Sequence, residues 1–134
     1  MSVPVRVAEN HQGRYNQTVS AGAHTFFADE PPSLGGADTG AAPYDLLLAS
    51  LGACTSITLR MYAERKNLPL THVEVALHHE KVEQDGKSLD KITRQIHLEG
   101  DLSDEQRQRL LEIANKCPIH RLLSHAPLIE SSLA

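Results

Sequence analysis

The chain has 134 residues, a length that suits one domain and leaves no room for a separate cofactor-binding domain. Its 13 Lys and Arg stand against 17 Asp and Glu, giving a net charge of −4 that is scattered along the chain. There is no basic tract, and Phe, Trp and Tyr make up only 4% of the residues, so nucleic acid is not an expected partner and substrates stacked between rings are disfavoured.

The first residues lack the unbroken apolar core of a signal peptide, which favours a cytoplasmic protein. Paired cysteines in that reducing compartment are more often catalytic, redox-sensing or inert than a permanent cross-link. Cys54 and Cys117 lie too far apart in the sequence for a local CxxC loop. Folding must therefore bring them together if they work as a pair.

The first third of the chain has the composition of short antiparallel strands. Segments with Val, Tyr, Thr and Phe alternate with turn residues, which predicts strands at 4–8, 14–20 and 23–28. The Pro- and Gly-rich segment 30–40 is expected to form an ordered loop, because too little chain precedes it to make a domain of its own.

A helix is predicted to begin at Pro43, with Asp45 favourably placed in its first turn. Segment 46–59 is apolar on nearly every side, which indicates a helix buried in a core or an interface. That run is shorter than the ~20 residues needed to cross a bilayer, so no membrane partner is expected. The helix should stop near Pro69, where proline forbids continuation.

Two segments, 73–77 and 92–98, alternate apolar and polar residues and predict a pair of antiparallel strands. Asp85-Gly86 between them is a hairpin turn signal. Arg94 is the exception in the pattern, because it occupies a position where the alternation calls for an apolar residue.

The C-terminal part of the chain should open with a helix. Ser103 and Gln106 fit a capping box at the start of a helix reaching to about residue 116. Cys117-Pro118 interrupts it, and a helical turn over 119–124 and a last strand at 128–131 complete the prediction.

Each cysteine has a structural and a chemical interpretation. Cys54 has no positive charge within one helical turn, so local sequence favours a buried small hydrophobe over a reactive thiol. Cys117 precedes a proline and has His120 and Arg121 in the next turn, which suits a polarised thiol as well as a helix-terminating core residue.

The two cysteine segments together resemble the OsmC/Ohr family. The run 43–55, Pro-Tyr-Asp-Leu-Leu-Leu-Ala-Ser-Leu-Gly-Ala-Cys-Thr, is similar to the central-helix motif of that family, and 116–121, Lys-Cys-Pro-Ile-His-Arg, is similar to its resolving-cysteine segment. The resemblance implies one α+β domain over residues 1–134, with curved antiparallel sheets packed around two central helices in an intertwined homodimer.

The same resemblance implies a cysteine-based peroxidase in oxidative stress defence, with no cofactor and no metal. Cys54 would attack an organic hydroperoxide, and hydrogen peroxide more weakly, to become a sulfenic acid. Cys117 would condense with it to a disulfide, which a dithiol such as a lipoyl protein would reduce.

The family's activating group is an arginine in the N-terminal strands, and Arg14 is the best match, with Arg6 as the fallback. The peroxidase subgroups place a glutamate at the position that is Tyr44 here, with Asp45 adjacent. That departure leaves open whether Tyr44 and Asp45 replace the glutamate.

Three other functions stay open on the sequence. The interface pocket could hold a small apolar ligand with incidental cysteines, or the two cysteines could act stoichiometrically as a redox sensor. A metal site at Cys117-x-x-His120 is the weakest reading, because no second Cys or His pair has structural zinc spacing.

Overall fold

The computed structural model describes residues 3–134 and has an α+β fold with antiparallel sheets. The chain groups into two compact units, 1–47 and 48–134, and the division falls inside helix α1 (Pro43–Arg65). The expectation of one domain over 1–134 stays a prediction.

The first unit holds a three-stranded antiparallel meander, as the sequence indicated. Strands β1 (Val5–Glu9), β2 (Gln17–Ala21) and β3 (His24–Ala28) pair in the order β1-β2-β3. The second strand begins later than predicted, because 11–16 forms bends in which Asn10 bonds back to Asn16 through backbone and side chain. Arg14 therefore lies in the β1–β2 connection and not in a strand.

The loop after β3 is ordered around one carboxylate. Buried Asp29 accepts hydrogen bonds from the backbone N–H groups of Glu30, Ala37 and Thr39 and from the Thr39 hydroxyl. Gly36 packs so closely that a Cβ there would come within 1.9 Å of the Glu30 carbonyl oxygen. A short 3-10 helix, η1 (Pro32–Leu34), interrupts the segment, and the predicted ordered loop is confirmed.

Helix α1 begins at Pro43 as predicted, and Asp45 accepts the N–H of Ala42 in its first turn. The buried side is a single stripe of six residues: Leu51, Gly52, Thr55, Leu59, Tyr62 and Ala63. Gly52 allows a close approach, since a Cβ there would lie 2.8 Å from Leu77 Cδ1. Other apolar side chains of the helix, among them Ile57 and Met61, are exposed in the single chain.

By length and composition α1 could reach across a bilayer, with 28% of its apolar stretch buried inside the structure. The helix is longer than the apolar run 46–59, from which its reach was predicted. Core helices of globular proteins meet the same criteria, and the absence of a membrane partner stays a prediction.

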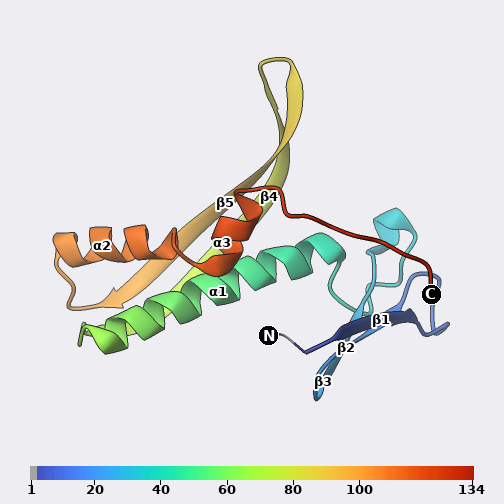
Figure 1. Ribbon diagram of the computed structural model, residues 1–134, viewed down its shortest axis with the longest axis horizontal. Helices are drawn as coiled ribbons and strands as arrows, with labels where there is room; N and C mark the ends of the chain where they lie inside the picture. The colour runs from blue at the N-terminus through green and yellow to red at the C-terminus, as the bar shows by residue number, and fades with distance from the viewer. Residues whose placement is uncertain (1–2) are drawn as a thin grey trace. The chain divides into compact units, whose positions relative to one another are not determined.

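The second unit carries a two-stranded ribbon much longer than the sequence pattern suggested. Strands β4 (Leu70–Gln84) and β5 (Lys87–Gly100) pair along their whole length. Asp85 and Gly86 turn the chain at φ values of 52° and 76°, the left-handed geometry of a tight hairpin. Figure 1 shows the far half of this ribbon extending beyond the helices of the unit.

Helices α2 (Asp104–Ala114) and α3 (Pro118–Leu123) follow the ribbon. The predicted capping box is present: Ser103 Oγ accepts the Gln106 N–H, and the Gln106 side chain accepts the Ser103 N–H. Eight residues of α1, α2 and the adjoining chain form the core: Leu59, Tyr62, Ala63, Leu70, Leu102, Leu110, Ile113 and Ala114.

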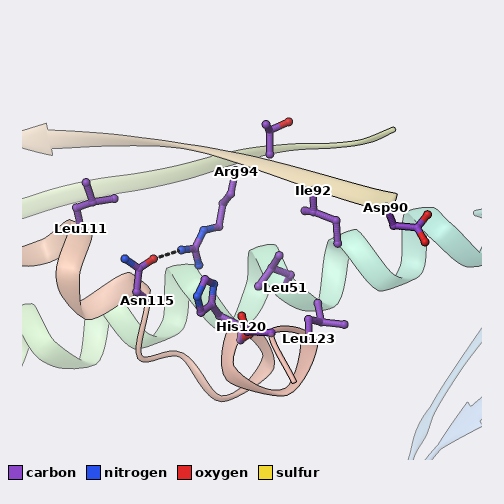
Figure 2. A pocket seen from close by; sticks show the side chains of 10 residues that line it. Leu51, Asp90, Ile92, Arg94, Leu111, Asn115, His120 and Leu123 are labelled. Carbon is purple, nitrogen blue, oxygen red and sulfur yellow. Dashed lines mark hydrogen bonds between the residues drawn. The ribbon is translucent and has the colours of Figure 1, made fainter. Parts of the chain in front are cut away.

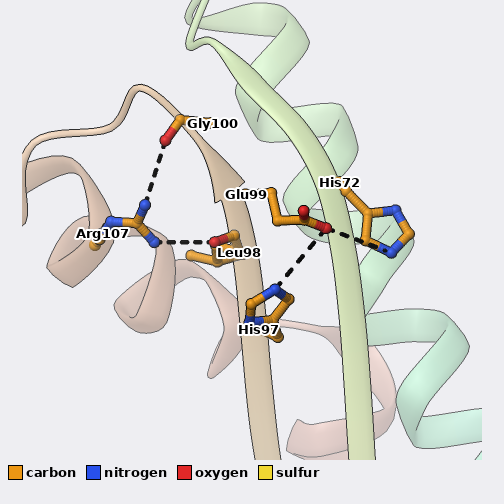
Figure 3. A network of polar contacts seen from close by, with 6 residues as sticks. All are labelled: His72, His97, Leu98, Glu99, Gly100 and Arg107. Atoms are coloured by element: carbon orange, nitrogen blue, oxygen red, sulfur yellow. Dashed lines mark hydrogen bonds and ion pairs between the residues drawn. The ribbon is translucent and has the colours of Figure 1, made fainter.

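Arg107 ties α2 to the end of β5 by donating to the carbonyls of Leu98, at 3.0 Å, and Gly100, at 3.3 Å. Figure 3 shows these bonds beside the exposed His72–Glu99–His97 contacts. The end of the ribbon at Gly100 is thereby fixed to α2, which contributes to the core.

The last predicted strand, at 128–131, is wrong. The chain has no regular structure after α3, and Leu128 and Ile129 are 98% and 82% exposed. Pro127 removes a backbone donor, and no described strand pairs with this segment, so two neighbouring apolar residues are not enough to make a strand.

Candidate redox site

Cys54 is a free, half-buried cysteine in the middle of α1. The side chain of Cys117 hydrogen-bonds to it, as do the Ile119 N–H and the Thr58 hydroxyl. Burial is the main effect and raises the pKa of the Cys54 thiol, and the hydrogen bond with Cys117 raises it further. In the resting pair Cys54 therefore holds its proton.

Cys117 is fully buried and caps the N-terminus of α3. Its Sγ accepts the His120 N–H at 3.3 Å. Burial raises the pKa of the Cys117 thiol, but the hydrogen bonds from Cys54, the His120 N–H, the Thr55 hydroxyl and the Ile119 N–H outweigh burial and lower this pKa overall. The structure thus brings the two cysteines together and makes Cys117 the more acidic thiol.

An arginine that the sequence analysis did not assign to the site lies beside this pair. Arg94 donates from Nη1 to the hydroxyl oxygen of Thr55 at 2.9 Å and to the Ala114 carbonyl at 3.1 Å, and from Nη2 to Asn115 Oδ1 at 2.8 Å. Its signal in the sequence was the broken alternation of β5, where a charged residue takes an inward-facing position.

A pocket of about 460 Å³ opens beside Arg94. Figure 2 shows the guanidinium pointing from β5 toward Asn115 and His120. The lining combines polar and apolar side chains: Leu51, Asp90, Ile92, Thr93, Arg94, Leu111, Asn115, His120, Leu123 and Ser124.

His120 gives the thiol its backbone N–H. Burial, and secondarily the charge of Arg94, lowers the pKa of the His120 imidazole. The ring is therefore neutral near pH 7, and the contact of His120 with Cys117 is made by its backbone N–H.

The predicted arginines belong to the first unit. Arg14 stacks over the ring of Tyr15, 5.1 Å from its centroid, and its Nη1 lies close to Gly35. Arg6 lies on exposed β1. The roles predicted for both stay predictions. Tyr44 is exposed, and Asp45 has the helix-start contact already described.

Within residues 3–134, no three His, Cys, Asp or Glu side chains are grouped so as to hold a metal ion. Glu99 contacts only two histidines, with Oε2 3.9 Å from His72 Nε2 and 3.8 Å from His97 Nε2. At Cys117-x-x-His120, the contact with the Cys117 sulfur is made by the backbone N–H of His120 and not by its ring.

The family model described as OsmC-like protein matches residues 35–132, a span that contains both cysteine segments. The chain belongs to the OsmC family. No sequence of a curated protein matches it.

Solved structures of OsmC proteins share the fold. An OsmC-like protein from Mycoplasma pneumoniae superposes with a TM-score of 0.78 at 17% identity, covering 94% of this chain and 89% of that one. An organic hydroperoxide resistance protein OsmC from Legionella pneumophila gives 0.69 at 18% identity, covering 92% and 89%. One from Elizabethkingia anophelis, with thiocyanate bound, gives 0.67 at 20% identity, covering 90% and 86%.

Proposed function

We propose that this protein is a thiol-dependent peroxidase that reduces organic hydroperoxides, and hydrogen peroxide more weakly, in cytoplasmic oxidative stress defence. The observation that carries the proposal is the interaction between the side chains of Cys54 on α1 and Cys117 at the start of α3, two free cysteines that the fold of this unit brings together. Membership of a family that includes organic hydroperoxide resistance proteins supports it.

The two thiols differ in a way that suits a division of roles. Cys54 is half-buried and Cys117 is fully buried, so an incoming hydroperoxide reaches Cys54 more easily. Cys117 is the more acidic thiol, so its thiolate is the base that takes the Cys54 proton. The nucleophile and its base are then neighbours in one hydrogen-bonded pair.

The reaction balances with these two groups. The Cys54 thiolate attacks the outer oxygen of the hydroperoxide, the O–O bond breaks, and the alkoxide takes the proton held by Cys117 and leaves as an alcohol. Cys54 is now a sulfenic acid and Cys117 is a thiolate again. Its sulfur attacks the Cys54 sulfur, and hydroxide leaves as water after protonation by solvent. An external dithiol, for which a lipoyl protein is proposed, returns both thiols.

A homodimer is part of the proposal. Large apolar side chains are exposed in the single chain on three elements, namely Val5 and Val7 on β1, Phe26 and Phe27 on β3, and Ile57 and Met61 on α1. Large apolar side chains are seldom left in water in such numbers, and a second copy of the chain would cover them.

The test is steady-state consumption of cumene hydroperoxide and hydrogen peroxide, with a dihydrolipoyl recycling system and a dithiothreitol control. Cys54→Ser should abolish turnover, and Cys117→Ser should leave one stoichiometric reaction ending in sulfenic acid. Arg14→Ala, compared with Arg6→Ala, tests which arginine contributes. Equal partial losses in both cysteine variants would contradict the assigned roles.

The alternative is an OsmC protein that binds a small apolar ligand or senses oxidants without efficient turnover. The pocket beside Arg94, of about 460 Å³, favours this alternative because apolar side chains form part of its lining. No turnover by a folded protein with both thiols reduced would select it. Formation of one disulfide per chain without recycling would then identify the sensor.

A further inference from the structure

Arg94 is a half-buried cation without an anionic partner. Its three hydrogen-bond acceptors, the Thr55 hydroxyl, the Ala114 carbonyl and the Asn115 amide oxygen, are all neutral. Among residues 3–134, no carboxylate lies within ion-pair distance of its guanidinium. The one acid in the same pocket, Asp90, is paired with His79 and Lys81.

A half-buried cation of this kind is stabilised further by a counter-charge that forms nearby, because its own solvation is incomplete. Asp90 and His120 line the same pocket as Arg94. The Cys117 N–H and Arg94 Nη1 donate to the same Ala114 carbonyl, and the Cys117 thiol, which interacts with that of Cys54, also interacts with the Thr55 hydroxyl. Of these, only the cysteine pair can supply an anion that is not already taken.

Thr55 connects Arg94 to the cysteine pair. Its side chain is fully buried, its oxygen accepts from Arg94, and its single hydroxyl hydrogen has two acceptors within reach. One is the Leu51 carbonyl, at 2.7 Å, and the other is the Cys117 sulfur. When Cys117 is ionised, the stronger acceptor is the thiolate, and the Arg94 bond makes the hydroxyl a better donor to it.

Resting on the proposed function, we propose that Arg94 is the positioning residue of the redox pair: through the Thr55 hydroxyl it supplies the positive charge that stabilises the thiolate of the Cys54–Cys117 pair. Fully buried Thr55 and Cys117 exclude water from this path, so the charge is screened far less than at a surface. The role lies within the second unit and needs no residue from elsewhere in the chain.

The chain offers a matched control. Arg107 is also half-buried, also comes near β5, and also donates two hydrogen bonds to carbonyls, those of Leu98 and Gly100. Within residues 3–134 its side chain makes no hydrogen bond to Thr55 or to either cysteine. Removing it tests the structural effect of losing an arginine without touching the thiols.

The experiment follows the ultraviolet absorbance of the thiolate as the pH is raised, for wild type, Arg94→Met, Arg94→Lys, Thr55→Val and Arg107→Met. The spectrum of the variant with both cysteines changed to serine is subtracted to remove the tyrosines. Circular dichroism establishes that each variant is folded. The readout is thiol ionisation itself, so it does not depend on peroxide turnover.

Arg94→Met should lower the ratio of thiolate to thiol at the wild-type midpoint by about tenfold, a shift of about one pH unit. Arg94→Lys should recover part of that loss, since it keeps the charge but not the planar fork that reaches both Thr55 and Asn115. Thr55→Val should shift the midpoint in the same direction, and Arg107→Met should titrate like wild type.

Two results would overturn the inference: an Arg94→Met protein that titrates like wild type, or an Arg107→Met protein that shifts as far as Arg94→Met. If the thiols titrate as expected but no hydroperoxide is consumed, the peroxidase proposal fails and the role of Arg94 stands. If hydroperoxide is consumed but Arg94→Met leaves the titration midpoint unchanged, the peroxidase proposal stands and the role of Arg94 fails.

Discussion

Arg94 on β5 donates a hydrogen bond to the buried hydroxyl of Thr55 on α1, with 2.9 Å between Nη1 and Oγ1. The same guanidinium bonds the C-terminal end of α2 at Ala114 and Asn115. One side chain thus joins three elements around the cysteine pair. Its loss is expected to affect stability as well as thiol chemistry, and the two effects can be measured apart.

We expect Arg94→Met and Arg107→Met to destabilise the protein by a similar amount, about 1–3 kcal/mol each, because both leave backbone carbonyls without a charged donor. Urea unfolding at pH 7 measures both. Similar losses would mean that a difference in thiol ionisation between the two variants reflects the place of Arg94 beside the thiols. If Arg94→Met leaves the free energy of unfolding unchanged, water replaces the hydrogen bonds of the Arg94 side chain readily.

Oxidation of the pair should make the protein more stable. A disulfide between Cys54 and Cys117 closes a loop of roughly 60 residues, which by the chain-entropy model stabilises the folded state by about 4 kcal/mol before any strain. One equivalent of cumene hydroperoxide should raise the urea midpoint, and dithiothreitol should return it.

The Cys117→Ser variant is the control for this measurement. It cannot form the bond within the chain, so its midpoint should not rise after oxidant treatment. A wild-type midpoint that falls on oxidation would indicate that closing the disulfide distorts α1 or α3, and it would count against a disulfide as a regular intermediate.

Much of the fold could be predicted because its signals are local. Pro43, the capping box at Ser103 and the Asp85-Gly86 turn each act within a few residues, and each is found where the sequence placed it. The strand expected at 128–131 failed because a strand needs a partner, and pairing is not a local property.

The site was predictable only in part, for the same reason. The two cysteines could be singled out by type and by resemblance, but the relative acidity of the thiols depends on the Thr55 hydroxyl and the N–H groups at the start of α3. Arg94 was visible as an irregularity in an alternating strand, yet its meaning required knowing that α1 lies under that position.

Asp29 should make the first unit sensitive to acid. Hydrogen bonds, first from the Thr39 hydroxyl and then from the Glu30 N–H, hold the pKa of this carboxyl below its usual value of 3.8. A lowered pKa in the folded state means that the stabilisation is fully present above about pH 4 and is lost as the pH falls through the folded pKa.

Asp29→Asn should therefore be less stable than wild type at pH 7, with the difference shrinking below pH 4, as followed by urea unfolding across that range. Asp38→Asn is the matched control in the same loop, since Asp38 is exposed and asparagine tolerates its positive φ of 54°. A stability difference for Asp29→Asn that persists unchanged in acid would contradict the carboxylate's role.

The exposed face of α1 gives the last prediction. Ile57 and Met61 are 54% and 61% exposed in the single chain and lie one helical turn apart. If a second copy covers them, Ile57→Glu should shift the protein toward a monomer, because a buried carboxylate without a partner opposes association. Sedimentation equilibrium over a range of concentrations measures the oligomeric state.

Leu133→Glu is the control, because Leu133 lies near the end of the chain and is 100% exposed. If wild type is monomeric at every concentration, the dimer is removed from the proposed function. If Leu133→Glu alone dissociates the protein, the interface does not lie on α1.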